Sequence, residues 1–193
     1  MTTDTRHLPT NRPAPPASTR WRRERWDEPG TIYFWSGRRG QFEAFSNFAA
    51  TPFPMPAWHD NAQVVDFATG EHAFQAAKSR SAADHERIRL ARGPLEAKRA
   101  GRRVALPADW NRQRTHVMLA VVRAKFTVPE LGELLLSTGE RILAENSPYD
   151  PVWGCRDRAG GYTGQNLLGR ALMCVRDELR YAAGRDDTPE PER

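Results

Sequence analysis

Two hydrophobic patterns divide the chain into short strands and amphipathic helices. Residues 31–35 read Thr-Ile-Tyr-Phe-Trp, a β-branched and aromatic run that predicts a strand. Residues 63–67 form a second run of this kind, which we expect to pair with a similar segment. The residues between the two runs are rich in Pro, Gly and Asn, and this composition predicts a long loop.

From residue 69 onward, apolar positions recur every three or four residues, a spacing that predicts helices. The expected helices run from residue 71 to about 80, from a cap at Ser81 and Asp84 to near Gly93, from Pro94, from a cap at Asp109 to Phe126, from Pro129 to Thr138 and Gly139, and from 167 to 183 with Gly184 at the C-terminal cap. Residues 141–145 fit either a strand or a helix. The order predicts an α+β fold: a helix-dominated single domain with a few short β-strands.

The two ends of the chain differ in composition from the middle. Residues 1–29 are rich in Arg and Pro, and residues 184–193 are mostly charged or Pro, so we predict flexible tails on either side of a domain of residues 30–183. Trp21 and Trp26 lie in an Arg-rich cluster of the first tail. These indoles could stack on nucleic-acid bases, or they could pin the tail on the domain. We expect removal of residues 1–29 to leave the activity nearly intact.

The composition favours a soluble, cytoplasmic protein. Of the 193 residues, 39% are hydrophobic and 27% are charged, and no apolar run approaches the roughly 18 residues of a membrane span. The start of the chain lacks the apolar core of a secretory signal. Two cysteines, Cys155 and Cys174, are too few for a disulfide framework, and the histidines show no metal-ligand spacing. We therefore expect free thiols, no membrane partner, no metal and no cofactor.

The basic residues are almost all arginine. The formal net charge of +5 suits a phosphate-bearing ligand or nucleic acid but decides little alone. Of the 29 basic residues only three are lysines, Lys78, Lys98 and Lys125. Arg supplies a permanent charge, whereas a buried Lys can lose its proton and act as a base or nucleophile. The three lysines are therefore candidates for lysine-specific chemistry, although chance explains their survival equally well.

Two groups of polar residues on predicted helices could carry chemistry. Glu71, Gln75 and Lys78 are spaced at i, i+4 and i+7, so they lie along one side of a helix. Lys98 and Arg102 form an i, i+4 cationic pair that a phosphate or carboxylate between them would stabilise. The alternatives are an ordinary exposed Glu-to-Lys stripe and two solvated cations.

A third group is the stiff loop of residues 145–154, which holds two prolines and a Trp-Gly pair. Rigid loops often present reacting groups, and here Asp150 offers a carboxylate and Trp153 a surface for a flat base. An Asx turn and a core tryptophan explain the same two residues. Residues 160–170 form a glycine-rich segment whose amides could hold an anion, although it lacks a phosphate-loop ending.

Taken together, these segments resemble the NADAR family, also called YbiA-like. The matching pieces follow the family's order across residues 31–180 and are Tyr33-Phe-Trp35, Phe45-Ser-Asn-Phe48, Glu71-His with Phe74-Gln75 and Lys78, Ala97-Lys98 with Gly101-Arg102, Asp109-Trp110, Val117-Met118, Lys125-Phe126, Thr138-Gly139, Glu145 with Ser147-Pro148, Asp150, Trp153-Gly154, Gly164 with Asn166, Leu168-Gly169 and Leu172-Met173. All three lysines fall at matching positions, which favours a purpose for them. Residues 79–81 lack the family's aromatic residue, and a longer polar insertion follows residue 154, which puts the substrate preference in doubt but not necessarily the reaction.

The resemblance implies an N-glycosidase that needs no cofactor. Some relatives hydrolyse the ribosylamine bond of phosphorylated riboflavin-pathway intermediates, and others remove ADP-ribose from the exocyclic amine of guanine in DNA, sometimes as antitoxin to an ADP-ribosylating toxin. Both substrates join an exocyclic nitrogen to C1′ of a ribose, where an acid can protonate the leaving group and a base can deliver water. The implied partners are therefore ADP-ribose or a ribose-phosphate-bearing small molecule, ADP-ribosylated DNA, and a toxin.

The resemblance also suggests roles for individual residues. We expect Glu71 to be a general acid or base, Asp150 a second carboxylate, and Lys98 a nucleophile or phosphate anchor. The expected substrate-binding residues are Trp35, Ser46, Asn47, Phe48, Lys78, Arg102, Trp110, Trp153, Gly154, Gly164 and Asn166. The alternatives are a non-catalytic module that binds ADP-ribose or a nucleotide in the same pocket, and a nucleic-acid adaptor that acts through the N-terminal tail.

Overall fold

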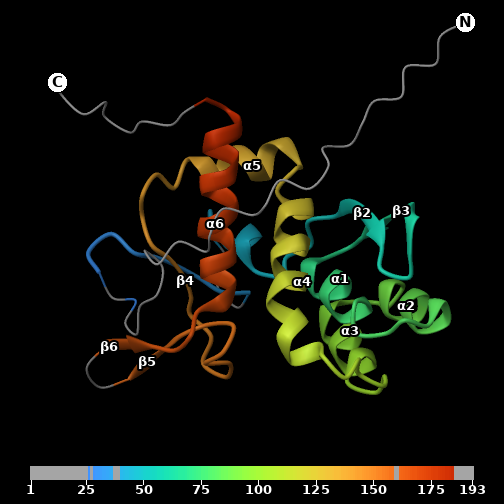
Figure 1. Cartoon of the computed structure of the whole chain (residues 1–193). Coiled ribbons are helices and arrows are strands. Elements are labelled where there is room, and N and C mark those ends of the chain that lie inside the picture. The colour runs from blue at the N-terminus through green and yellow to red at the C-terminus, as the bar shows by residue number, and fades with distance from the viewer. Residues whose placement is uncertain (1–25, 27, 37–39, 159–160, 185–193) are drawn as a thin grey trace, which may run out of the picture.

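The computed structural model describes residues 26, 28–36, 40–158 and 161–184, which form a helix-dominated α+β domain (Figure 1). The helices are α1 (Gly70–Ala76), α2 (Ala82–Arg89), α3 (Pro94–Gly101), α4 (Trp110–Lys125), α5 (Pro129–Leu136) and α6 (Leu167–Ala182), with a 3-10 helix η2 (Glu43–Phe45). The strands are β1 (Ile32–Phe34), β2 (Phe53–Ala57), β3 (Asp60–Phe67), β4 (Leu143–Glu145), β5 (Arg156–Arg158) and β6 (Gly161–Thr163). This confirms the predicted fold class.

The strands pair in three separate two-stranded units. β2 and β3 form an antiparallel pair, and so do β5 and β6. β1 lies parallel to β4, with Ile32 opposite Leu143 and Phe34 opposite Glu145. A parallel pair needs a long connection, and here that connection contains α1 to α5. The β1–β4 pair therefore places Phe34 and Glu145, which lie far apart in the sequence, next to each other.

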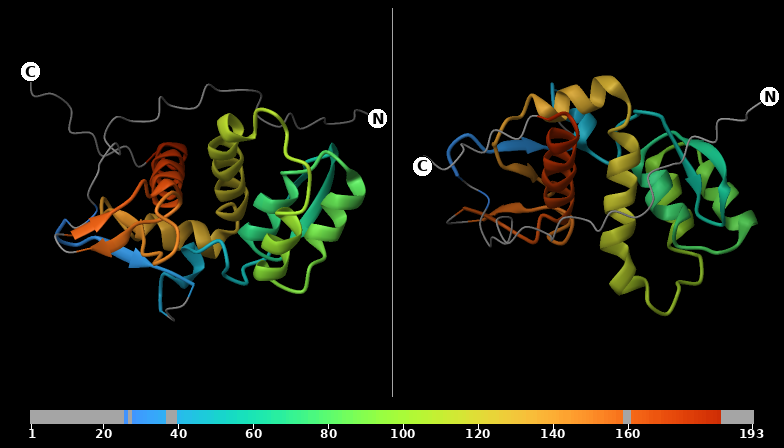
Figure 2. Two further views of the ribbon diagram at one scale, coloured as in Figure 1. Left: turned by 90° about the horizontal axis from the view of Figure 1, so that it is seen from below. Right: turned by 45° about the horizontal axis from the view of Figure 1, so that its top comes forward.

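Helices α4 and α6 run side by side through the middle of the domain, between two groups of elements (Figure 1, Figure 2). One group holds the β2–β3 hairpin with α1, α2 and α3, and the other holds β1, β4 and the β5–β6 hairpin. One cluster of buried apolar side chains includes members of both groups, among them Phe67 of β3 and Leu143 of β4. The two central helices therefore have apolar neighbours in both groups, which keeps the groups in a fixed relation.

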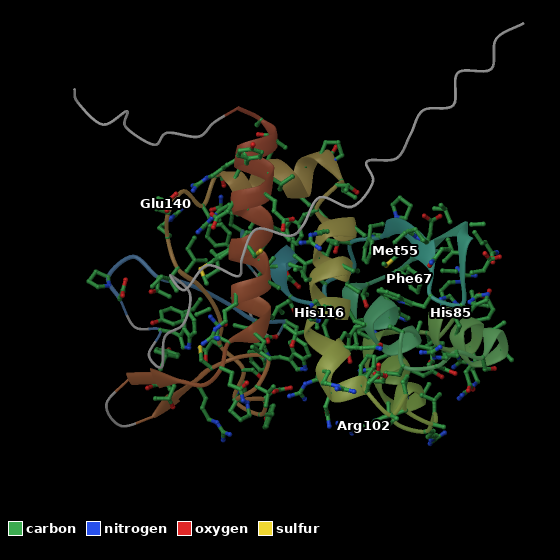
Figure 3. The ribbon with its side chains drawn as sticks, in the orientation of Figure 1. Met55, Phe67, His85, Arg102, His116 and Glu140 are labelled. Atoms are coloured by element: carbon green, nitrogen blue, oxygen red, sulfur yellow. The ribbon has the colours of Figure 1, made fainter. Side chains whose placement is uncertain are left out.

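A histidine fills part of the core beneath the β2–β3 hairpin. Met55 and Phe67 lie near His85 of α2 (Figure 3). The rings of Phe67 and His85 meet edge-on, with their centroids 5.7 Å apart. Burial lowers the pKa of His85 to about 4, with a further contribution from His59. His85 is therefore neutral at physiological pH and serves as a core residue.

The long loop predicted between the first two runs is wrong in part, because it contains η2 and strand β2. β2 reads Phe-Pro-Met-Pro-Ala, and its two prolines hide the strand pattern. Phe53, Met55 and Ala57 are buried, whereas Pro54 and Pro56 are exposed. Proline is tolerated there because a two-stranded pair leaves one edge of β2 without a hydrogen-bonding neighbour. Of residues 141–145, which fitted either a strand or a helix, residues 143–145 form strand β4. The β5–β6 pair was not predicted.

The ends of the helices follow local capping chemistry, with one correction. The Thr69 hydroxyl accepts from the backbone N–H of His72 at the start of α1, and Ser81 caps α2 as predicted. Asp109 does not cap α4 with its side chain; its carboxylate accepts from the Gln113 amide instead. Among the described residues, no helix is long and apolar enough to cross a bilayer.

Trp26 belongs to the packed core, although the sequence analysis assigned it to the first tail. Its side chain is fully buried, and its indole N–H donates to the Gly164 carbonyl over 2.9 Å. The Trp26 carbonyl accepts from the Tyr33 hydroxyl, and the Arg170 guanidinium lies over the indole ring. The domain therefore includes residue 26, and Trp26 is pinned on the body as one interpretation expected. Trp21 lies outside the described residues.

Candidate active site

A pocket of about 330 Å³ lies where the two groups of elements meet. Its lining consists of Trp35, Ser36, Ser46, Asn47, Phe48, Glu71, Phe74, Gln75, Lys78, Lys98, Met118, Glu145, Ser147, Tyr149, Asp150, Trp153 and Leu168. The volume is at the lower end of the range for small-molecule sites, about 300–1,000 Å³. Three carboxyl groups and two amines therefore converge in a space suited to a small ligand.

Glu71 lies in the first turn of α1, a helix whose seven residues are all buried. Its Oε1 accepts from the Gln75 amide over 2.8 Å. Burial raises the pKa of Glu71, while the charges of Lys98 and Lys78 and the Gln75 hydrogen bond act in the opposite direction. The site therefore places the Glu71 carboxyl in an apolar setting but supplies three groups that favour its ionised form.

Glu145 ends strand β4 and is the one pocket carboxyl that was not among the predicted catalytic residues. Burial raises the pKa of its carboxyl to about 8, and the negative charges of Asp150 and Glu71 act in the same direction. No hydrogen bond to this carboxyl is formed by the residues that the structure describes, and the charge of Lys98 acts against the other influences by lowering its pKa. Glu145 is therefore protonated at neutral pH, next to carboxyls with stabilising partners.

The backbone around Glu145 is held firmly. Its N–H donates to the Asn166 side chain over 3.1 Å, and its carbonyl accepts from the Cys155 N–H over 2.8 Å. Asn166 is fully buried and also donates to the Leu143 carbonyl over 2.9 Å. Because Asn166 has a left-handed backbone with φ of 49°, it turns the chain into α6 while holding β4. The acid is thus fixed at both ends of its backbone unit.

Two lysines line the pocket near the carboxyls: Lys78 from the turn after α1, and Lys98 from α3. Burial lowers the pKa of Lys78, and the positive charges of Lys98 and Arg102 lower it further. The Lys78 ammonium lies 5.8 Å from the ring centroids of both Phe74 and Trp110. The Lys98 ammonium lies 5.5 Å from the Phe48 ring. Three cations therefore gather at one side of the pocket.

The loop of residues 147–153 completes the opposite wall. Asp150 Oδ1 accepts from the backbone N–H of Val152 over 2.9 Å and of Trp153 over 3.0 Å. Asp150 also donates its N–H to the Ser147 hydroxyl over 3.2 Å. Trp153 packs edge-on against Phe74 at 5.1 Å. Asp150 is therefore an Asx-type turn residue and a pocket carboxylate at once, so both interpretations of this loop describe part of it.

Lys125 supports the pocket from behind. Its side chain is 1% exposed, and its amine donates to the Ser46 carbonyl over 2.9 Å. Burial lowers the pKa of Lys125 to about 7. Asn47, which follows Ser46 in the chain, donates from its side chain to the Met118 sulfur over 3.1 Å. The third lysine therefore holds the 46–48 segment in place without lining the pocket.

The comparisons with known proteins decide the family. Residues 33–180 match the model of the NADAR domain. The chain belongs to the NADAR family. It is 38% identical over 156 residues to an N-glycosidase of Nostoc punctiforme, a match that covers 78% of this chain and 93% of that protein. It is 37% identical over 139 residues to the N-glycosidase YbiA of Escherichia coli, covering 70% and 80%.

The fold agrees with this NADAR assignment. The solution structure of the E. coli protein YbiA superposes with a TM-score of 0.66 at 31% identity, covering 92% of this chain and 99% of that one. A chloroplastic riboflavin biosynthesis protein, PYRR, of Zea mays is 38% identical over 153 residues, which cover 72% of this chain but only 23% of that protein. This NADAR protein is an N-glycosidase, a hydrolase of bonds between a sugar and nitrogen.

The pocket brings together most of the residues that the sequence analysis selected. All three predicted catalytic residues, Glu71, Lys98 and Asp150, line it. The predicted substrate-binding residues that line it are Trp35, Ser46, Asn47, Phe48, Lys78 and Trp153. The lining residues that were not selected are Ser36, Phe74, Gln75, Met118, Glu145, Ser147, Tyr149 and Leu168. A signal for Glu145 was present, because it is an acidic residue at the end of an apolar run that opens the stiff loop.

Five residues predicted to contact the substrate lie outside the pocket lining. Trp110 is 7% exposed and packs behind the pocket against Phe74, with ring centroids 5.5 Å apart. Arg102 is exposed at the end of α3 (Figure 3), close enough to Lys78 for its charge to act on that amine. Asn166 uses its side chain on the backbone of β4, as described above. We therefore expect Trp110 and Asn166 to position the site and Arg102 to act at its edge.

Gly154 and Gly164 are required for close backbone packing. A Cβ on Gly154 would lie 2.6 Å from the Glu145 carbonyl, and one on Gly164 would lie 2.6 Å from the Gly154 carbonyl. Gly164 also has a positive φ of 146°, a conformation that side chains disfavour. Gly154 therefore lies directly against β4, and Gly164 lies directly against Gly154. Their close packing helps to bring Asp150 and Glu145 to the same pocket, and the phosphate contact expected for the glycine-rich segment stays a prediction.

No group of three or more His, Cys, Asp or Glu side chains in the described part of the chain could hold a metal ion. Burial raises the pKa of Cys155 to about 12 and that of Cys174 to about 11. Both thiols are free and protonated, so neither is an activated nucleophile.

Proposed function

We propose that this protein hydrolyses the bond between an exocyclic amine and C1′ of a phosphorylated ribose. The observation that carries the proposal is the pocket in which a protonated carboxyl, Glu145, faces a second buried carboxyl, Glu71, beside Lys98 and Lys78. Burial raises the pKa of both acids, but the Gln75 hydrogen bond and the charge of Lys78 favour the ionised form of Glu71, and such a difference divides the acid and base roles between neighbouring carboxyls. Glycoside hydrolysis needs both roles at one C–N bond.

Glu145 acts as the general acid in this mechanism. Its carboxyl donates a proton to the exocyclic nitrogen as the C1′–N bond breaks and the bonding pair of electrons moves to nitrogen. The sugar is left as an oxocarbenium-like centre. The Glu71 carboxylate then removes a proton from water as the water oxygen bonds to C1′. Asp150 stands nearby as the second carboxylate, where its charge favours the positive sugar.

Lys78, Lys98 and Arg102 supply the charge for a phosphate. None of the three forms an ion pair with another residue in the described part of the chain, and burial first and then the repulsion of Lys98 and Arg102 lower the pKa of Lys78. An anion between them would relieve that repulsion. Lys98 could instead capture the opened sugar as a Schiff base. Borohydride added during turnover separates the two roles, because only a Schiff base leaves a stable sugar adduct on Lys98, detectable by mass spectrometry.

Two substrate classes meet this description. Phosphorylated ribosylamine intermediates of the riboflavin pathway are the first candidate, because a riboflavin biosynthesis protein is among the relatives and a pocket of about 330 Å³ suits a ligand of their kind. ADP-ribose linked to guanine in DNA is the second, because the formal net charge of +5 favours association with a polyanion. A protein that serves the second class as antitoxin would also have a toxin partner.

A side-by-side hydrolysis assay tests the proposal. The protein is incubated with a phosphoribosylamine of a diaminopyrimidine and, separately, with an oligonucleotide that carries ADP-ribose on guanine. Release of ribose 5-phosphate from the first or of ADP-ribose from the second identifies the substrate class. Binding of either ligand without any release contradicts the proposal and supports the non-catalytic module. For either substrate, we expect the reaction to take place in the cytoplasm.

A further inference from the structure

Among the large hydrophobic side chains that the structure describes, the most exposed one belongs to Tyr149, which lines the pocket. Tyr149 is 86% exposed, whereas the other large exposed hydrophobic side chains are 52% to 67% exposed. Of this group only Tyr149 lines the pocket. An aromatic side chain that is both open to solvent and part of a site is available to a ligand without first giving up contacts.

The backbone that carries Tyr149 is fixed, although its ring is open. Tyr149 lies between Pro148 and Asp150, and the next residue is Pro151. Ser147 donates its N–H to the Cys155 carbonyl over 2.8 Å, and the Asp150 hydrogen bonds described above hold the other side. The two prolines limit φ on both sides of this pair. The backbone of this segment is therefore ordered before a ligand binds, and only the side chain of Tyr149 has to be ordered on binding.

The pocket chemistry indicates which part of the substrate meets the ring. Lys78, Lys98 and Arg102 are the proposed contacts of the phosphate. Glu71 and Glu145 are the proposed acid–base groups at the sugar carbon and its nitrogen. Tyr149 precedes Asp150 and shares a wall of the pocket with it. A group attached to the nitrogen and directed out of a small pocket would pass this wall. A flat ring on that nitrogen would have an aromatic face to stack on.

We propose that Tyr149 is a specificity-determining residue that stacks on the flat ring of the leaving group. The inference rests on the proposed function, because it assigns one wall of the same site. Stacking of a base on an aromatic side chain is tolerant of ring identity, so the contact selects flat leaving groups without choosing one base. Trp35, which also lines the pocket, is a second aromatic residue available on the same ligand.

The test compares Tyr149→Ala and Tyr149→Phe with Tyr181→Ala as a matched control. Tyr181 is 67% exposed on α6 and does not line the pocket, so its loss removes another exposed ring away from the site. We expect Tyr149→Ala to raise KM about 5- to 20-fold for whichever of the two substrates is hydrolysed, with kcat little changed. Tyr149→Phe keeps the ring face, so it should raise KM less than Tyr149→Ala does.

A binding measurement separates this proposal from damage to the pocket. Calorimetry with the free aromatic amine product should show weaker binding to Tyr149→Ala, whereas the Kd of ribose 5-phosphate should not change. The inference is overturned if Tyr149→Ala keeps the original KM, or if both affinities fall together. If neither the unchanged protein nor any variant hydrolyses either substrate, the proposed function is contradicted. That result differs from both results that would overturn the role of Tyr149.

Discussion

Replacing Glu145 by Gln removes the proton that the mechanism requires while keeping the size of the side chain. Loss of a general acid typically lowers the rate by about 10²–10⁴-fold, so we expect kcat to fall by at least about 100-fold. In the unchanged protein, Glu145 must be protonated, so kcat should decline as the pH rises through about 8. The variant should lose this alkaline decline along with most of its activity.

The same substitution should stabilise the fold at alkaline pH. Unfolded, the Glu145 carboxyl ionises near 4.5, whereas in the folded protein it keeps its proton to about 8. The folded state therefore loses stability as the pH rises from 4.5 to 8, because only the unfolded state gains from ionisation over that interval. The difference of 3.5 units (8 − 4.5) corresponds to about 4–5 kcal/mol at most. We expect Glu145→Gln to recover about 1–3 kcal/mol of it, since the amide must also be accommodated.

The assay measures steady-state rates between about pH 5 and pH 10 and denaturant unfolding at about pH 5 and pH 8. Glu133→Gln on the exposed face of α5 is the control, because it makes the same chemical change away from the pocket. A variant that keeps the original kcat and its alkaline decline would refute the role of Glu145 as acid. A variant that loses activity and is also less stable at pH 8 would show instead that Glu145 is structural.

Three further substitutions test how the fold supports the site. Gly101→Ala should lower both Tm and turnover, because the new Cβ would lie 2.1 Å from Gln75 Oε1, whereas Gly40→Ala, with nothing within 4 Å, should change neither. Lys125→Met should raise the free energy of unfolding most below about pH 7. This advantage should shrink between about pH 7 and pH 10.5, because there the folded lysine is neutral while the unfolded one is still charged. A difference in the free energy of unfolding that stays constant across this interval would contradict the lowered pKa of Lys125. Trp26→Ala should cost about 3–5 kcal/mol of stability and lower turnover, and urea unfolding that matches the unchanged protein would exclude its role as an anchor.

The position of Trp26 changes the expectation for truncation. Removal of residues 1–25 should leave hydrolysis intact, whereas removal of residues 1–29 also deletes the indole that donates to the Gly164 carbonyl. Composition alone predicted that the longer deletion would leave hydrolysis nearly intact. An Arg- and Pro-rich composition describes the average of a segment and does not reveal one buried residue within it. Comparing the two deletions in the same hydrolysis assay measures the contribution of the anchor.

The chain itself determines the helices and their polar faces. Spacing alone places Glu71 and Gln75 on one side of α1, with Lys78 in the turn that follows the helix, because helix geometry is local and needs no knowledge of distant residues. The stiffness of the 147–153 loop is also local, since its prolines and the Asp150 side chain act on neighbouring backbone groups. The scarcity of lysine likewise singles out three positions from composition alone, and two of these lysines line the pocket.

Only the tertiary structure decided which of these groups meet and what protonation each one has. Glu145 reaches the pocket because β4 pairs with β1 and because Gly154 and Asn166 hold the later segment against it, which are contacts between distant parts of the chain. Its high pKa arises from burial next to Glu71 and Asp150, and burial is a property of the packed domain. A sequence shows that a carboxyl is present, but the loss of solvent around it follows from the fold.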